Sequence, residues 1–266
     1  MPDTIKIVAI GSGHLASHLV PALHDIGCEI LQVYSRSIYN ANSLAHQVNA
    51  EAINELEKLN PEADIYLVMI KDDHIESLCN FLPSLSGKQI LAHTAGARSI
   101  DVLAEASENY GAFYPLETFR KGQEKNMKEV PFLVNGNNDH TTRSLRVLAR
   151  RISDNVSESS DDDRLKYHIS AVFINNFVNH LACLVHQYLD DNDLDISYLD
   201  AITKSGFERI LSHESCSSQT GPAQREDHQL IRKHLKMLED APHLGNVYKT
   251  LSDSIIRLNK TKDENS

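Results

Sequence analysis

Short apolar runs alternate with segments of helical spacing through the first half of the chain. The apolar runs, which predict buried strands, cover residues 5–10, 29–35, 65–70, 89–96 and 130–136. The helical segments cover residues 14–27, 43–50, 74–82, 99–107 and 140–152. Unbroken apolar strands that alternate with helices are typical of a parallel sheet covered on both faces. The pattern therefore predicts an α/β fold, with a Rossmann-like, mostly parallel sheet domain.

The pattern changes in the second half of the chain. Residues 153–163 are polar, acidic and serine-rich, which suits a last strand and an interdomain joint. Beyond them, helical spacing covers residues 162–189, 197–212, 222–239 and 243–259. We therefore predict two domains: a nucleotide-binding domain at residues 1–158 and a smaller all-α domain at residues 159–266.

The segment 162–189 is apolar on most sides, so it should be buried centrally or shared with a second subunit. A line of polar residues nevertheless runs along it, formed by His168, Asn175, Asn179 and His186. Polar groups in a buried helix need partners. They would either bond to neighbouring helices or face a wet cleft against the first domain, and the sequence leaves both interpretations open.

Composition narrows the classes of partner. A formal net charge of −11 disfavours nucleic acid and anionic membranes. The four cysteines form no CxxC pair, which indicates a reducing compartment, and the 14 histidines show no metal-binding spacing. The longest apolar run, at 65–70, is too short to cross a bilayer. We expect a cytoplasmic protein without a metal site.

A glycine-rich turn follows the first predicted strand. Gly11 allows a tight turn, Gly13 lets the backbone approach a diphosphate, and Ala16 keeps the following helix close to the strand. The start of that helix adds amide donors and the positive end of its dipole. The predicted phosphate loop consists of Gly11, Ser12, Gly13, His14 and Leu15.

The end of the second predicted strand indicates which dinucleotide is bound. Folds that prefer NAD place an acidic residue there for the ribose 2′-hydroxyl. No acidic residue lies between Gln32 and Asn42 in this chain. Arg36, flanked by Ser35 and Ser37, could instead hold a 2′-phosphate, although it could also be a solvated surface residue. We therefore predict NADP as the cofactor.

Five segments resemble one bacterial family of NADP oxidoreductases, in which a Rossmann-like domain precedes a conserved helical domain of unknown function. They are IGSGHLASHL (10–19), HTAG (93–96), YPLETF (114–119), YHISAVFINNF (167–177) and QTGPAQRED (219–227). The architecture is also similar to pyrroline-5-carboxylate reductase and the 3-hydroxyacid dehydrogenases. The resemblance implies hydride transfer between two domains and dimerisation through the helical domain. This chain departs from the family at Tyr114, where members commonly have histidine, and at Glu226, where they commonly have glycine.

Four clusters of polar residues are candidates for the chemistry. The candidate catalytic residues are His93, Tyr114 and Asn176. The candidate substrate-binding residues are Thr94, Glu117, Thr118, His168, Asn175, Thr220 and Arg225. Each has a structural alternative: packing for the histidine and the phenol, helix–helix hydrogen bonds for the asparagines, and an ion pair for the arginine. We also expect Thr220 and Gly221 to cap a helix whose first residue is Pro222.

These observations predict an NADP-dependent oxidoreductase that transfers a hydride between nicotinamide and a small polar C=O or C=N substrate. The partners expected are this small molecule and a second copy of the chain. A non-catalytic NADP-binding sensor or scaffold is the main alternative, because the imidazole of the family is missing at Tyr114. Hydride exchange between two cofactors, as in deazaflavin-dependent NADP reductases, is a third possibility.

Overall fold

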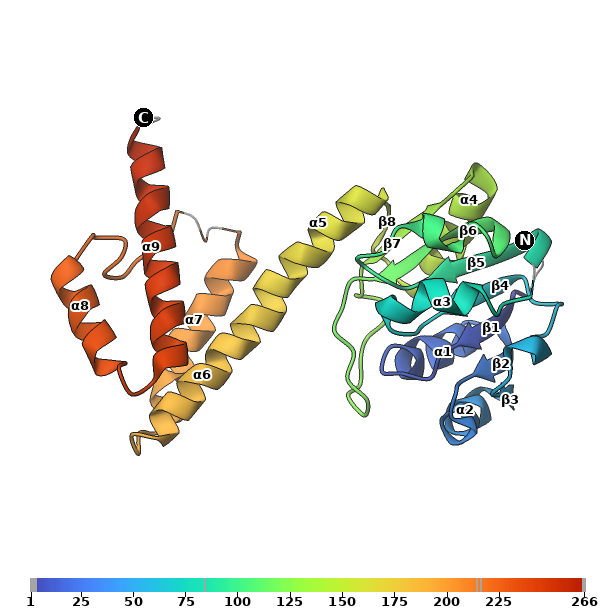
Figure 1. Ribbon diagram of the computed structural model, residues 1–266, viewed down its shortest axis with the longest axis horizontal. Helices are drawn as coiled ribbons and strands as arrows, with labels where there is room; N and C mark the ends of the chain where they lie inside the picture. The colour runs from blue at the N-terminus through green and yellow to red at the C-terminus, as the bar shows by residue number, and fades with distance from the viewer. Residues whose placement is uncertain (1–3, 84, 214, 216, 265–266) are drawn as a thin grey trace. The chain divides into compact units, whose positions relative to one another are not determined.

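The computed structural model describes residues 4–83, 85–213, 215 and 217–264, so Cys216 lies outside the described part. Two compact units, Met1–Ala171 and Val172–Ser266, make up the chain (Figure 1). The division falls inside a helical segment that runs from Asp161 to Asp190.

The first unit is built on an eight-stranded sheet with the order β3-β2-β1-β4-β5-β6-β7-β8. The strands are β1 (Lys6–Ile10), β2 (Glu29–Tyr34), β3 (Glu51–Ile53), β4 (Ile65–Val68), β5 (Leu85–His93), β6 (Ser107–Pro115), β7 (Phe132–Gly136) and β8 (Val156–Glu158). Among these strands, only β6 and β7 pair antiparallel. The predicted α/β fold with a mostly parallel sheet is confirmed.

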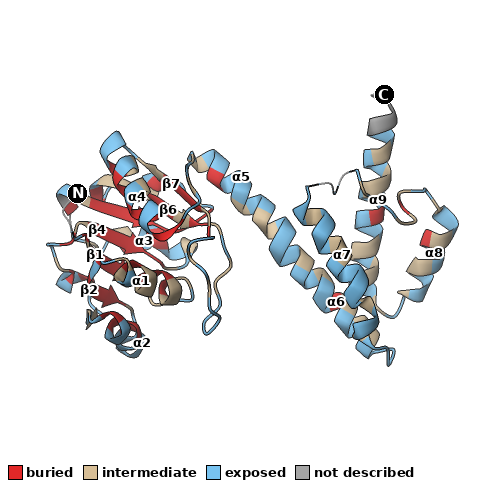
Figure 2. Ribbon diagram, turned by 180° about the vertical axis from the view of Figure 1, so that it is seen from behind, coloured by how far each residue is buried: buried red, intermediate tan, exposed pale blue. Residues whose placement is uncertain are grey.

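Helices cover both faces of this sheet. They are α1 (Ala16–Asp25), α2 (Ile38–Ala45), α3 (Ile75–Cys79) and α4 (Asp139–Ile152). Helix α5 (Asp161–Ala171) follows β8, and most of its residues are exposed. Side chains of β1 alternate between two cores, as strand geometry requires. Ile7 and Ala9 pack in one core with residues of α1 and α4, whereas Val8 and Ile10 pack in the other with residues of α3. Figure 2 shows the buried residues concentrated along the strands.

Two strands were not predicted from the sequence. β3 is a three-residue edge strand, and β6 lies inside the sheet between β5 and β7. The segment 99–107, predicted as a helix, forms only the 3-10 turn Ile100–Leu103 before β6 begins. Tyr114 and Pro115 are therefore the last residues of a strand.

The second unit is helical. Its elements are a π-helical segment (Val172–Phe177), α6 (Val178–Asp190), a 3-10 turn (Ile196–Leu199), α7 (Asp200–Leu211), α8 (His228–Met237) and α9 (Pro242–Glu264). The predicted cap at Thr220 and Pro222 is wrong. Residues 222–226 form turns, and α8 is capped by Asp227, whose carboxylate accepts the backbone N–H of Leu230 at 3.0 Å.

The helical unit buries few of its own side chains (Figure 2). Within its described part, the buried residues are Leu184, Ala223, Ile231 and Ser252. Phe173, in the π-helical segment, is 61% exposed. The long apolar helix is therefore largely exposed in the described part of the chain, and the predicted central burial is not seen there.

Candidate functional site

The carboxyl end of β1 leads into the predicted phosphate loop. Gly11 has a φ of +129°, and a Cβ atom at this position would overlap the carbonyl oxygen of Met69, so only glycine fits without strain. A Cβ at Gly13 would meet no atom within 4 Å and would project into open space. Helix α1 then starts with no side-chain cap and no acidic residue in its first turn, which leaves its positive end available to an anion.

A cavity of about 670 Å³ opens above this loop. It is lined by seven of the predicted cofactor-binding residues, namely Gly11, Ser12, Gly13, His14, Leu15, Ser35 and Arg36. Ser37 is not among the lining residues, because its hydroxyl caps α2 by accepting the N–H of Asn40 at 3.4 Å. Asn40, Lys71 and His74 also line the cavity and were not predicted. Lys71 could have been suspected, since it follows an apolar run at the carboxyl end of a strand.

The end of β2 presents hydroxyl and guanidinium groups to this cavity. The hydroxyl of Ser12 donates to that of Ser35 at 2.8 Å, which ties the phosphate loop to the end of β2. Arg36 is exposed and forms no ion pair with any residue that the structure describes. The cavity lining contains no carboxylate, so a phosphate ester would meet no fixed negative charge there.

His93 and Thr94 hold the turn that follows β5. His93 is fully buried; its Nδ1 accepts the N–H of Ala95 at 3.1 Å, and its Nε2 faces the carbonyl oxygen of Ser99 at 3.3 Å. Burial, together with the positive charge of Arg164, lowers the pKa of His93 to about 4, so the ring is neutral. Thr94 donates its hydroxyl to the carbonyl oxygen of Val68 at 3.2 Å. Both ring nitrogens of His93 are thus engaged within the protein, as in the packing role that the sequence left open beside a catalytic one.

The structure brings Tyr114 and His168 together, although they are 54 positions apart in the sequence. The Tyr114 hydroxyl lies 3.1 Å from Nδ1 of His168, and both side chains are half-buried. Gly96 permits this contact, because a Cβ there would lie 2.8 Å from Cζ of Tyr114 and 2.6 Å from Nδ1 of His168. Burial, with a contribution from the carboxylate of Asp72, raises the pKa of Tyr114 to about 12. The phenol is therefore protonated at neutral pH.

Asp72, in the turn after β4, was not predicted as a site residue. Burial raises the pKa of its carboxyl above the ordinary value, although the positive charges of His168 and Arg98 act in the opposite direction. The half-buried carboxyl is thus electrostatically coupled to both members of the Tyr114–His168 pair.

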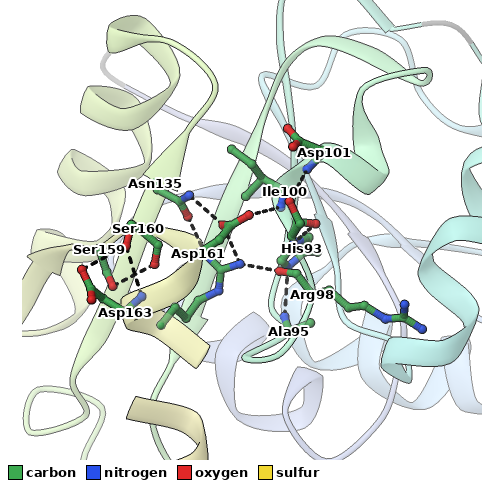
Figure 3. A network of polar contacts seen from close by, with 12 residues as sticks. His93, Ala95, Arg98, Ile100, Asp101, Asn135, Ser159, Ser160, Asp161 and Asp163 are labelled. Atoms are coloured by element: carbon green, nitrogen blue, oxygen red, sulfur yellow. Dashed lines mark hydrogen bonds and ion pairs between the residues drawn. The ribbon is translucent and has the colours of Figure 1, made fainter. Parts of the chain in front are cut away.

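A buried arginine, Arg164, anchors the start of α5 within a polar network. Figure 3 labels other members of this network, among them Asn135, Asp161 and Arg98. Arg164 is 1% exposed and donates to the side-chain oxygen of Asn135 at 2.7 Å and to the carbonyl oxygen of Arg98. It also forms an ion pair of 2.8 Å with Asp161, which accepts the N–H of Ile100 at 3.0 Å. Arg164 was missed because charged residues near a helix start usually face solvent. It lies one helical turn before His168, so this network fixes the position of that histidine.

The other predicted residues are placed as follows. The carboxylate of Glu117 accepts the N–H of Thr118 at 2.7 Å and pairs with Lys125 at 3.2 Å, so it is engaged locally. Asn175 and Asn176 lie in the π-helical segment of the second unit. Thr220 and Arg225 lie between α7 and α8 of that unit. Their roles in substrate binding stay predictions.

Comparisons with known proteins identify the family of this chain. A model described as shikimate/quinate 5-dehydrogenase matches residues 2–76, and one described as a domain of unknown function, DUF2520, matches residues 130–255. A "putative NADP oxidoreductase" from Bacteroides fragilis is 34% identical, with a TM-score of 0.87 over 96% of this chain and 98% of that one. The chain belongs to the same family as this NADP oxidoreductase. A search of curated proteins finds no match.

More distant structures share the fold of this oxidoreductase family member. A 1-pyrroline-5-carboxylate reductase from Streptococcus pyogenes is 17% identical, with a TM-score of 0.59 over 96% of this chain and 99% of that one. An imine reductase from Myxococcus stipitatus, solved with NADP⁺, is 14% identical, with a TM-score of 0.65 over 98% of this chain and 95% of that one. A variant of that enzyme was solved with NAD⁺. The fold is that of reductases that use a nicotinamide dinucleotide, whether NADP or NAD.

Proposed function

We propose that the protein is an NADP-dependent oxidoreductase that acts on a small polar C=O or C=N substrate. The observation that carries this proposal is the cavity above the phosphate loop, in which Gly13 leaves open space and no carboxylate is present. The amides of residues 11–15 would hold the diphosphate, and Ser35 and Arg36 would hold the 2′-phosphate. When bound, the nicotinamide supplies or accepts the hydride.

Turnover distinguishes this function from its main alternative. NADPH oxidation, followed by absorbance, would be measured with a panel of aldehydes, keto acids and imines. The proposal expects substrate-dependent oxidation by at least one class. Tight binding of NADPH without turnover of any compound would instead support a sensor or scaffold.

The role of Arg36 can be tested by replacing it with alanine. Because a guanidinium–phosphate contact is charge-assisted, Arg36→Ala should weaken NADPH binding by about 10- to 100-fold. NADH lacks the 2′-phosphate, so its affinity should change by less than about twofold. Calorimetry with both coenzymes measures the difference, with Arg150→Ala, an exposed arginine on α4, as the control. Equal losses for NADPH and NADH would remove Arg36 from this role.

We propose in addition that the protein is a homodimer through its helical unit. The apolar stripe of the helix is exposed, with Ile169 48%, Phe173 61% and Phe177 48% accessible. A unit with so few buried residues lacks a core of its own, so it needs a partner that is always present, and a second copy of the chain meets this requirement.

The same helix is long and apolar enough to span a membrane by length and composition alone, with a mean hydropathy of 1.3 over its most apolar window. This is weak support for a membrane location, because core and interface helices meet the same criterion. Histidine and asparagine side chains along it, such as His168, Asn175 and His186, would be costly in hydrocarbon. We therefore place the protein in the cytoplasm, where its described cysteines, which are free, would stay reduced.

Sedimentation tests the dimer. We expect a dimer at micromolar concentration and a shift towards monomer for Phe173→Asp, because a charge in an apolar interface is unfavourable. Val147→Asp, at a residue 42% exposed on α4, is the matched control and should leave the oligomeric state unchanged. Monomeric wild-type protein at that concentration would refute the proposal.

A further inference from the structure

We infer that Tyr114 and His168 form a proton relay to the oxygen of the substrate. The substrate class reduced at this site is then a carbonyl compound rather than an iminium ion. The inference rests on the proposed oxidoreductase function. The relay accounts for the absence of the family's histidine at position 114. The imidazole of His168, in α5, takes the place of that histidine and acts through the phenol of Tyr114.

The pair lies at the edge of the sheet where ligand-binding loops gather. Strands β1, β2, β4, β5 and β6 run parallel, so their carboxyl ends share one edge. Gly11 follows β1 at this edge, Gly96 follows β5, and Tyr114 ends β6. Ligands in open α/β sheets bind outside the carboxyl ends of the strands. The phenol is therefore on the same edge of the sheet as the cavity for the cofactor.

The pair is also held in place from both sides. On one side, the backbone of Gly96 packs so closely against both rings that any larger residue would displace them. On the other side, the Arg164 network fixes the helical turn that carries His168. Positioning of this kind is what proton transfer requires, because donor and acceptor must stay within hydrogen-bond distance.

Charged groups around the pair favour proton delivery. The acidic group that faces both rings is Asp72, and the cationic groups nearby are Arg98 and Arg164. Tyr114 remains protonated at neutral pH, so it serves as a donor and not as a resting base.

The proton balance distinguishes the two substrate classes. When a hydride from the reduced nicotinamide adds to a carbonyl carbon, the π electron pair moves to the oxygen, which must take a proton. Tyr114 donates its phenolic proton to this oxygen and recovers one from Nδ1 of the His168 imidazolium. Water then reprotonates the imidazole. An iminium becomes a neutral amine on accepting hydride and needs no proton, so a relay would have no role there.

The test compares this pair with a second tyrosine–histidine pair. Tyr248 and His234, in the helical unit, share a hydrogen bond of 2.9 Å and provide matched control variants. Tyr114→Phe should reduce kcat/KM for a carbonyl substrate by about 100-fold or more. His168→Gln should reduce it by about 10-fold, because the phenol then loses the imidazole that returns its proton. Tyr248→Phe and His234→Gln should leave kcat/KM unchanged.

Two further readouts separate the possible failures. NADPH affinity, measured by fluorescence, should be retained in Tyr114→Phe and His168→Gln. If the wild-type protein does not bind NADPH, the proposed function itself is refuted. ¹⁵N chemical shifts of the His168 ring should change in Tyr114→Phe and not in Tyr248→Phe. The relay is rejected if those shifts are unchanged. It is also rejected if the protein binds NADPH and reduces only imines, or no carbonyl compound of the panel.

Discussion

Gly13→Val should weaken NADPH binding by about 100-fold or more while the protein stays folded. A Cβ added at this position would meet no protein atom within 4 Å, so the fold has open space there. The same open space is where the backbone must approach the diphosphate, and branched methyl groups would keep the phosphates away from the amides. A loss of several hydrogen bonds to a charged group accounts for an effect of this size.

The choice of glycine is important for this experiment. Gly11→Ala would also abolish binding, but it would do so by damaging the fold, because its φ of +129° and its contact with Met69 require glycine. A Cβ added at Gly206 would lie 3.9 Å from the nearest atom, which belongs to the side chain of Arg209. Gly206→Val is therefore the suitable control. Calorimetry and a thermal melt are measured together. Gly13→Val protein that melts like wild type and binds NADPH with unchanged affinity would contradict the predicted site.

Arg164→Met should lower the stability of the first unit substantially. The arginine is 1% exposed and joins α5 to β7 and to the turn after β5 through Asn135, Asp161 and Arg98. Removal of the guanidinium leaves the partly buried carboxylate of Asp161 and the side-chain oxygen of Asn135 without their main partner. Breaking a buried ion pair from one side typically costs about 3–5 kcal/mol, and we expect about 3 kcal/mol because Asp161 keeps other donors.

The same helix offers a matched control for that substitution. Lys166 and Asp163 have the same i, i+3 spacing as Arg164 and Asp161, but their side chains are 73% and 56% exposed. Lys166→Met should therefore leave stability nearly unchanged. Urea denaturation of both variants measures the contrast. Similar midpoints for Arg164→Met and the wild type would show that the network does not anchor α5.

Much of the first unit could be predicted because its signals are local. β1 and β4 are unbroken apolar runs, since both of their faces are covered. β6 was missed because Gly111 and Pro115 suggest a turn. The structure gives Gly111 another role: a Cβ there would overlap the backbone of Asn135 in β7, so the glycine permits close strand pairing.

The candidate site likewise has one part that could be predicted from local sequence and one part that could not. The residues of the predicted phosphate loop are contiguous in sequence, so their spacing alone indicated the loop, and in the structure they line one cavity. Tyr114 and His168 are separated by 54 positions, and their contact depends on the register of β6 and on the anchoring of α5. The position of the α8 cap was likewise not evident, because Pro222 and Asp227 are both suitable residues for a helix start and only packing decides between them.

Calorimetric titration of NADPH into the wild-type protein tests the central claim most directly, namely that the loop at residues 11–15 and the end of β2 hold a phosphorylated nicotinamide dinucleotide. The account predicts one site per chain, with tighter binding of NADPH than of NADH. The absence of binding heat for both coenzymes, at concentrations well above those used by reductases, would contradict it.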